Sequence, residues 1–290
     1  IPVSSMPGVF QLSLDDAVEK IRTESKRGVN QFMLFGVVSQ EQKDEIGSAC
    51  LNDDSPVAKL IRKVRKEKID ALLIADLCFC EYTDHGHCGV LSSDQDETID
   101  HEKTREILAQ QAHILAKAGA DIIAPSGMID GMVKAIRRGL DQERYESIPV
   151  MSYTTKFASN FYGPFREAGE GAPQFGSRQA YQMDYARSKE WQLEVEADVQ
   201  QGADMLLVKP AMSYLDILHQ VSEKYSQPVG AYHVSGEYSM LHAAAEKGYL
   251  DLEKAAIEQL LALKRSGASF IVSYFADQIL DWKTFKEFSS

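Results

Sequence analysis

The chain has 290 residues, 44% of them hydrophobic, which is enough to bury a large core in either two ordinary domains or one α/β barrel. Its 31 Lys and Arg residues against 43 Asp and Glu residues give a net charge of −12, which disfavours nucleic acid and anionic membranes because both would be repelled. A small soluble substrate is the better expectation. No apolar run approaches the roughly 18 residues of a membrane-spanning helix, and the first residues lack the pattern of a signal peptide. We therefore expect a cytoplasmic protein with no membrane or nucleic-acid partner.

Short apolar runs rich in β-branched residues recur along the chain, with a helical pattern between each run and the next. They predict strands at 32–38, 71–77, 121–126, 149–154, 205–210, 229–234 and 270–275. Continuous apolar strands that alternate with amphipathic helices indicate a parallel sheet that helices cover on both faces.

The junctions between these units carry helix-end signals. A glycine that can adopt the left-handed conformation precedes four of the strands, at Gly28, Gly119, Gly202 and Gly267. Helix starts are marked by Ser13, by Ser55 with Pro56 after it, and by Asp100. The units are therefore helices that end just before buried strands.

Seven units with polar residues just after the strands predict a (β/α)8 barrel, the TIM-barrel fold, as a single domain over residues 1–290. The count is one short, and no strand pattern precedes the first unit, so we expect the first strand and anything before it to be missing from this chain. A doubly wound open sheet is the alternative. It is disfavoured because no Gly-rich dinucleotide-binding fingerprint follows any strand.

The segment 76–89, with the sequence DLCFCEYTDHGHCG, follows one predicted strand and holds three of the four cysteines. In a reducing compartment such a cluster favours a metal site or a catalytic centre over disulfides. Three thiolates, from Cys78, Cys80 and Cys88, would leave one position of a zinc ion open, as in a catalytic site. His85 and His87 could be further ligands or could hydrogen-bond around the metal.

The fourth cysteine, Cys50, stands alone in the sequence, and we expect it to be a small buried apolar residue.

Two lysines end apolar runs, Lys156 after VMSYTT and Lys209 after MLLV. A lysine at a strand end that faces a barrel mouth is partly desolvated, and two such lysines repel each other. Both effects lower the pKa of an ammonium group and favour the free amine, which attacks carbonyl carbons. The pair therefore predicts Schiff-base chemistry.

Residues 157–184 after Lys156 are rich in Gly, Pro and aromatic residues and have no periodicity, which is typical of a functional lid. Two arginines within this segment, Arg166 and Arg178, could hold carboxylates with their planar forks of donors.

The chain resembles the porphobilinogen synthase (5-aminolevulinate dehydratase) family. The resemblance runs from MPGVFQLS near the start to IVSYFA near the end. It rests on the segments DLCFCEYTDHGHCG, APSGMIDG, MSYTTKFASNFYGPFREA, SRQAYQMD, LLVKPAMSYLDI, YHVSGEYSM and KRSGASFIVSYFA. The resemblance implies a lyase (hydro-lyase) of heme and tetrapyrrole biosynthesis that condenses two 5-aminolevulinate molecules into porphobilinogen with loss of two waters.

The resemblance also implies roles for particular residues in a barrel with two substrate subsites. Lys156 would serve the A site and Lys209 the P site. By matching position, Ser235 and Tyr274 would hold the P-site carboxylate, and Asp76 and Ser126 the P-site amino group. The A-site carboxylate would be held by Arg166, Arg178 and Gln182. The walls of the pocket would be Tyr232 and Phe165.

The metals and the assembly follow from the same resemblance. Cys78, Cys80 and Cys88 match the ligands of the zinc-dependent members, and Glu194 matches an acidic residue of an allosteric magnesium position. Family members are homo-oligomers in which an N-terminal arm wraps a neighbouring subunit. No such arm precedes the first unit here, which puts the octamer of the family in doubt for this chain.

Two other functions remain open from the residues alone. The chain could be a Schiff-base aldolase, in which one lysine is catalytic and the cysteines are structural. It could also be a catalytically silent metal-binding or scaffolding barrel.

Overall fold

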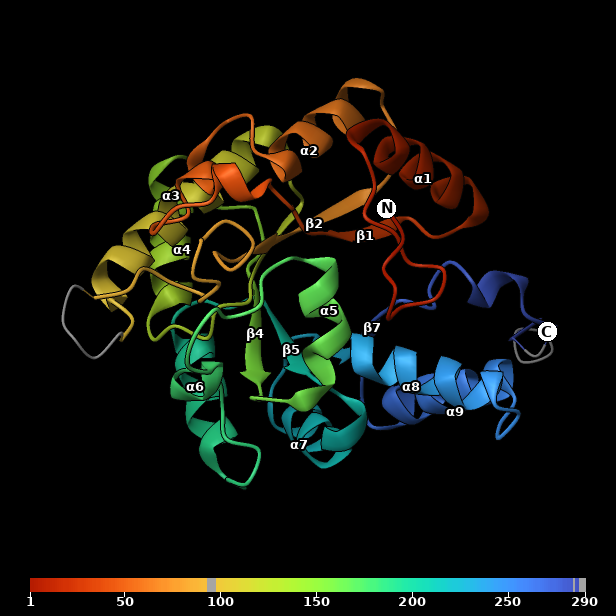
Figure 1. The fold of residues 1–290 in the computed structure, drawn as a ribbon. Helices are drawn as coiled ribbons and strands as arrows, with labels where there is room; N and C mark the ends of the chain where they lie inside the picture. The colour runs from red at the N-terminus through yellow and green to blue at the C-terminus, as the bar shows by residue number, and fades with distance from the viewer. Residues whose placement is uncertain (93–97, 284, 287–290) are drawn as a thin grey trace.

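The computed structural model describes residues 1–92, 98–283 and 285–286. Strands alternate with helices along the chain, and Figure 1 shows the helices arranged around the strands. The described strands are β1 (Gln31–Leu34), β2 (Leu72–Leu77), β3 (Ile122–Pro125), β4 (Met151–Lys156), β5 (Met205–Lys209), β6 (Val229–His233) and β7 (Phe270–Ser273). The described helices are α1 (Leu14–Arg27), α2 (Pro56–Lys66), α3 (His101–Ala118), α4 (Met132–Gln142), α5 (Gly163–Ala168), α6 (Glu190–Gln200), α7 (Leu215–Lys224), α8 (Ser235–Glu246) and α9 (Leu252–Arg265).

The sequence predicted the position of each of these strands. Strand β1 is shorter than expected because its register with β2 ends at the pair Leu34 and Ala75, beyond which the chain leaves the sheet. The lid segment 157–184 also differs from a purely irregular loop, because it contains helix α5.

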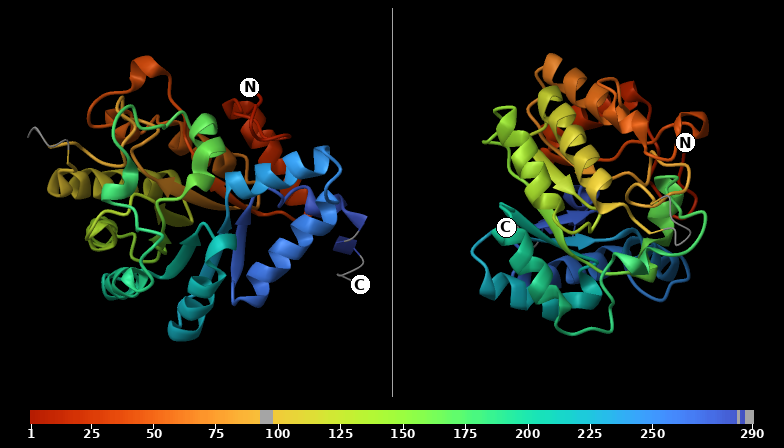
Figure 2. Two further views of the ribbon diagram at one scale, coloured as in Figure 1. Left: turned by 60° about the horizontal axis from the view of Figure 1, so that its bottom comes forward. Right: turned by 90° about the vertical axis from the view of Figure 1, so that its left-hand side faces the viewer.

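All of the pairings between the described strands β1 to β7 are parallel. The strand order is β1-β2-β3 in one sheet and β4-β5-β6-β7 in the other, and a parallel bridge between Ile123 and Val150 joins the two. The views of Figure 2 show the helices packed outside the strands. The strands therefore follow one another in sequence order around a barrel wall, which places their C-terminal ends on one face.

The helix ends follow the signals in the sequence. The side chains of Ser13 and Asp100 accept hydrogen bonds from backbone N–H groups in the first turns of α1 and α3, and Pro56 opens α2. The glycines at positions 28, 119, 202 and 267 all have positive φ, between 98° and 105°. None of the helices in the described part of the chain has both the length and the apolar character needed to cross a membrane.

Two of the apolar clusters in the described part of the chain form the layers on either side of the strands. The larger layer lies between strands and helices and includes the buried Cys50, as expected for that residue. Burial raises the pKa of the Cys50 thiol to about 12, so it is an inert apolar group. The smaller layer fills the barrel interior with residues such as Met151, Tyr153, Leu207 and Tyr232.

Strand β4 carries one extra residue relative to β5. Ser152 pairs with Leu206 but Thr155 pairs with Val208, so three steps along β4 match two steps along β5. This is the geometry of a β-bulge, which redirects the side chains that follow it.

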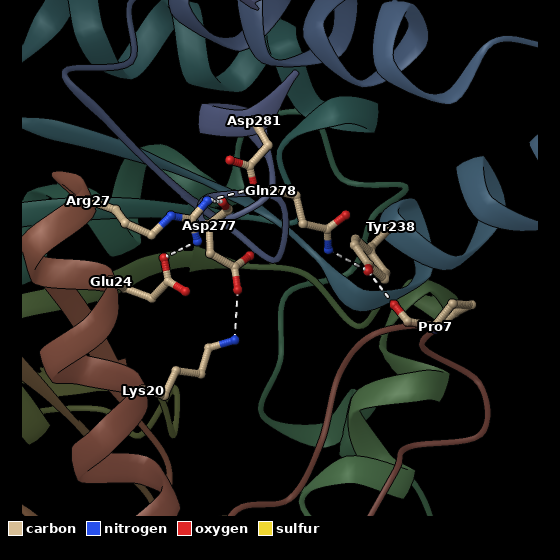
Figure 3. Close-up of polar contacts among 8 residues, drawn as sticks. All are labelled: Pro7, Lys20, Glu24, Arg27, Tyr238, Asp277, Gln278 and Asp281. Carbon is tan, nitrogen blue, oxygen red and sulfur yellow. Dashed lines mark hydrogen bonds and ion pairs between the residues drawn. The ribbon is translucent and has the colours of Figure 1, made fainter. Parts of the chain in front are cut away.

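The first and last units of the chain are joined by polar contacts (Figure 3). Lys20 of α1 forms an ion pair of 2.7 Å with Asp277, and Arg27 forms another of 2.7 Å with Asp281. The hydroxyl group of Tyr238 donates to the carbonyl oxygen of Pro7. These contacts fix α1 against the residues that follow β7 and the N-terminal segment against α8.

Candidate active site

The two candidate lysines lie side by side on neighbouring strands. Lys156 ends β4, Lys209 ends β5, and the two residues are Cα partners in the register. Their side chains are only 5% and 6% exposed, respectively. The structure therefore brings together the two amines that the sequence singled out.

Aromatic rings surround the Lys209 amine. Its Nζ lies 4.1 Å from the ring centre of Tyr232, 5.0 Å from that of Tyr153 and 5.4 Å from that of Phe165. Burial, followed by the charge of Lys156, lowers the pKa of Lys209 to about 7. Both causes were expected from the sequence, and the second follows from the register of β4 with β5.

Tyr153 and Tyr162 are site residues that the sequence analysis missed. Both amines lie over the Tyr153 ring, with Lys156 Nζ 5.7 Å and Lys209 Nζ 5.0 Å from its centre. The Tyr162 ring centre lies 5.5 Å from Lys209 Nζ. The Tyr162 hydroxyl donates to the carbonyl oxygens of Phe157 and Lys209, which ties the lid to the end of β5.

Asp76 and Ser126 occupy the neighbouring strand ends. The Ser126 hydroxyl donates to Asp76 Oδ2 at 3.1 Å, and Lys156 Nζ donates to the backbone oxygen of Ser126. Asp76 Oδ1 is buried without a hydrogen-bond partner among the described residues. Burial and the nearby Glu81 carboxylate raise the pKa of Asp76 to about 7. An unpaired acceptor beside two amines is suited to bind an amino group.

The three cysteines of the loop after β2 converge. The sulfurs of Cys78, Cys80 and Cys88 lie within 4.8 Å of one another, and all three residues are buried. The 3.4 Å between the sulfurs of Cys78 and Cys80 is close to the roughly 3.8 Å expected for two sulfurs on one tetrahedral zinc. Hydrogen bonds from Cys78 and Cys80 lower the pKa of the Cys88 thiol well below its usual range. The donor set and its geometry therefore fit a soft metal ion.

The histidines of this loop contact the lid. The ring nitrogens of His87 lie 3.2 Å from the hydroxyl of Tyr181 and 3.1 Å from the backbone oxygen of Phe175. His85 lies 3.1 Å from the backbone oxygen of Glu45 through Nε2 and accepts the N–H of His87 at Nδ1. These contacts favour the second of the two roles left open by the sequence, in which the histidines organise groups around the cysteines.

The lid presents three unpaired donors. Arg166 Nε, Arg178 Nε and Gln182 Nε2 are buried without hydrogen-bond partners among the described residues. Arg178 is anchored through its Nη2, which donates to the backbone oxygen of Gly86 at 2.9 Å. These are the three residues expected around the A-site carboxylate, and unsatisfied donors of this kind suit an anion.

The remaining expected residues lie at the start of α8 and beside a cavity. The Ser235 hydroxyl, at the first residue of α8, accepts the N–H of Phe165 at 3.0 Å. Tyr274 and Phe165 line a cavity of about 580 Å³, together with Phe35, whose ring stacks edge-on against Phe165. Phe35 was not identified from the sequence. The cavity reaches from Phe165 and Tyr274 to the N-terminal segment.

Glu194 of α6 lies apart from the lysines in a second cavity of about 630 Å³, which Asp130 and Gln182 also line. Burial, with the charges of Asp130 and Asp198, raises the pKa of Glu194 to about 7. Glu194, Asp130 and Asp198 together form a candidate cation-binding position. Asp130 and Asp198 were not identified from the sequence.

Comparison with known proteins identifies the family. The family model described as delta-aminolevulinic acid dehydratase matches residues 1–282. The chain belongs to the delta-aminolevulinic acid dehydratase family.

Individual members of the dehydratase family match over most of the chain. The delta-aminolevulinic acid dehydratases of Staphylococcus aureus and Staphylococcus epidermidis are each 47% identical over 277 residues, which is 96% of this chain and 85% of theirs. The solved delta-aminolevulinic acid dehydratase (porphobilinogen synthase) of Toxoplasma gondii, in complex with the product porphobilinogen, is 40% identical and superposes with a TM-score of 0.95. That match covers 98% of this chain and 81% of the other. The family and the barrel fold expected from the sequence are thereby confirmed.

Proposed function

We propose that this protein is a porphobilinogen synthase: a hydro-lyase that condenses two 5-aminolevulinate molecules into porphobilinogen and releases two waters, in tetrapyrrole (heme) biosynthesis. The observation that carries the proposal is the pairing of two buried lysines, Lys156 and Lys209, at the ends of β4 and β5. Two ketone substrates need two amines to form two Schiff bases. Membership of the dehydratase family supports the same reaction.

The lysines supply the covalent chemistry. With a pKa of about 7, a large fraction of Lys209, about half at pH 7, is the neutral amine that can attack a ketone carbon. Loss of water gives an iminium, which withdraws electrons from the adjacent carbon and so permits carbon–carbon bond formation. Lys156 would form the corresponding Schiff base with the second substrate. The aromatic rings around Lys209 keep water from its amine.

The polar groups around the lysines would orient the two substrates. Asp76 and Ser126 would hold the amino group of the P-site substrate, and Ser235 and Tyr274 its carboxylate, with Tyr232 and Phe165 as walls. The unpaired donors of Arg166, Arg178 and Gln182 would bind the A-site carboxylate.

Cys78, Cys80 and Cys88 would hold a zinc ion, because three buried sulfurs close to one another suit that soft metal. When bound, the zinc would supply Lewis-acid chemistry to the A side of the site. Arg178 lies beside this cluster: burial disfavours its charged form, but the Cys88 and Cys80 thiolates outweigh burial and raise its pKa. Its positive charge would partly balance the thiolates.

Further parts of the proposal concern regulation and organisation. Glu194, with Asp130 and Asp198 nearby, would bind a regulatory magnesium ion. We also propose that residues 1–290 form a single domain and that the protein acts in the cytoplasm as a homo-oligomer.

An assay for porphobilinogen, with and without added zinc, tests the proposal. Purified protein should form the pyrrole from 5-aminolevulinate, and a chelator should abolish the activity until zinc is restored. Borohydride reduction in the presence of 5-aminolevulinate should add mass to the peptide that contains Lys209. No adduct there would contradict the mechanism.

The same assay separates the two alternatives. A Schiff-base aldolase with structural cysteines would form a lysine adduct and retain its chemistry after chelation. A silent barrel would bind metal but form neither adduct nor pyrrole.

A further inference from the structure

We propose that Glu237 is a positioning residue of this active site, whose carboxylate fixes the segment after Lys209 against the start of helix α8 that carries Ser235. The inference rests on the proposed function and adds to it a residue without a role so far. Glu237 is 1% exposed, and its carboxylate accepts hydrogen bonds from two backbone N–H groups.

The two oxygens of Glu237 bind two different βα units. Oε2 accepts the N–H of Val234 at 2.7 Å, which caps the first turn of α8. Oε1 accepts the N–H of Met212 at 3.0 Å, in the loop that follows β5. A capping carboxylate needs only the first of these bonds. The second links α8 to the loop that follows the neighbouring strand β5.

The two amides flank residues of the site. Met212 follows Lys209 by three residues, and Val234 directly precedes Ser235. Strands β5 and β6, which lead into these segments, are neighbours in the sheet. Glu237 therefore holds the backbone that follows Lys209 at a fixed distance from the start of α8, where the Ser235 hydroxyl lies.

The start of α8 also supports the lid. The Ser235 hydroxyl accepts the N–H of Phe165 and donates to the backbone oxygen of Phe161 at 3.3 Å. At Gly236, a β-carbon would lie 2.8 Å from the Cα of Phe161, so only glycine permits this close approach. A shift of α8 would therefore move helix α5 and the Phe165 ring that covers Lys209.

The chemistry of the position supports a carboxylate. Burial raises the pKa of Glu237 to about 7, while the bonds from Val234 and Met212 lower it. In both hydrogen bonds a backbone N–H group donates to a carboxylate oxygen of Glu237. The side chain also lies at the N-terminal end of a helix, which favours a negative charge. An amide of the same size offers one oxygen acceptor, and its NH2 group would face an N–H donor.

The test compares Glu237→Gln with Glu246→Gln, which makes the same change at an exposed position of the same helix. For each purified protein, porphobilinogen formation gives kcat and KM, and thermal melting reports the fold. Borohydride trapping with 5-aminolevulinate, followed by peptide mass analysis, gives the ratio of adducts at Lys209 and Lys156.

We expect Glu237→Gln to lower kcat/KM by about 10- to 100-fold, the size of effect that a misplaced reacting group causes. Trapping at Lys209 should fall more than trapping at Lys156, and Glu246→Gln should match the wild type. If Glu237→Gln does not fold, Glu237→Asp takes its place: the shorter side chain keeps the charge but cannot reach both amides, so the same selective loss is expected.

Equal losses at both lysines would overturn the inference, because general destabilisation would then explain the effect. So would kinetics of the Glu237 variant that match those of Glu246→Gln. A wild-type protein that forms no porphobilinogen would contradict the proposed function, whereas an active wild type with an unaffected Glu237 variant would overturn only the role of Glu237.

Discussion

Lys156 and Lys209 are register partners at the ends of two neighbouring parallel strands, and both amines face the ring of Tyr153. Partners in a parallel register present their side chains to the same side of a sheet at close range. Because the charge of Lys156 disfavours the ammonium form of Lys209, the pairing itself contributes to the reactivity of Lys209.

This coupling predicts the effect of removing one charge. In the wild type, borohydride trapping at Lys209 should increase with pH, with a midpoint near 7, and level off about one unit higher, where the amine is mostly neutral. Replacing Lys156 with Met removes a charge that lowers the pKa of Lys209, so the midpoint should move to higher pH by on the order of one unit. The exposed Lys247→Met serves as the control, and an unchanged midpoint in Lys156→Met would refute the coupling.

The cysteine cluster predicts a selective loss of metal. Cys88→Ser should reduce zinc affinity more than about 100-fold, because the loss of a direct ligand exceeds that of a supporting contact. Cys50→Ala provides the matched control: it should retain the zinc content of the wild type and lose about 1 kcal/mol of unfolding free energy through its core cavity. Elemental analysis and thermal melting measure the two effects. Equal zinc in both variants would exclude the cluster as the site.

A side chain at position 86 should disturb the lid. The φ of Gly86 is +71°, and a β-carbon there would collide with the backbone oxygen of Ala172. Gly86→Ala should therefore displace the lid that carries Arg166 and Arg178 and reduce kcat/KM by roughly 10- to 100-fold, mainly through KM. Gly163→Ala lies at the start of α5, where a β-carbon meets nothing within 4 Å, and should have little effect. Steady-state kinetics of the two variants decide the matter.

The raised pKa of Glu194 sets the pH range in which we expect magnesium to act. This pKa is raised to about 7, so the carboxylate becomes charged as pH rises through that value. Magnesium should therefore stimulate the wild type more at pH 8 than at pH 6, and Glu194→Gln should show little stimulation at either pH. The assay is porphobilinogen formation across a magnesium titration. Equal stimulation of the variant would place the magnesium effect elsewhere.

Local signals in the sequence were sufficient for the fold. The helix-ending glycines and the caps at Ser13 and Asp100 depend on neighbouring residues only, and together with the apolar runs of the strands they located the βα units. The thiol cluster was predictable for the same reason, since short spacings within one loop keep its sulfurs close.

Contacts between distant segments could not be predicted in this way. His87 meets Phe175 and Tyr181 across about ninety residues, so nothing in its own loop indicates its partners. The bond from Met212 to Glu237 depends on the adjacency of β5 and β6, which is a property of the whole sheet.

Tyr153 shows a further limit. It is three residues from Lys156, and an odd spacing in a regular strand puts two side chains on opposite faces. The extra residue of β4 between Ser152 and Thr155 reverses this parity, so that ring and amine share the barrel interior.

The direction of the Lys156 side chain therefore depends on the number of residues in this part of β4. Deleting one residue between positions 152 and 155 would restore a regular strand and turn the Lys156 amine toward the helices. Here the number of residues, as well as their identity, determines whether two amines can act on two substrates together.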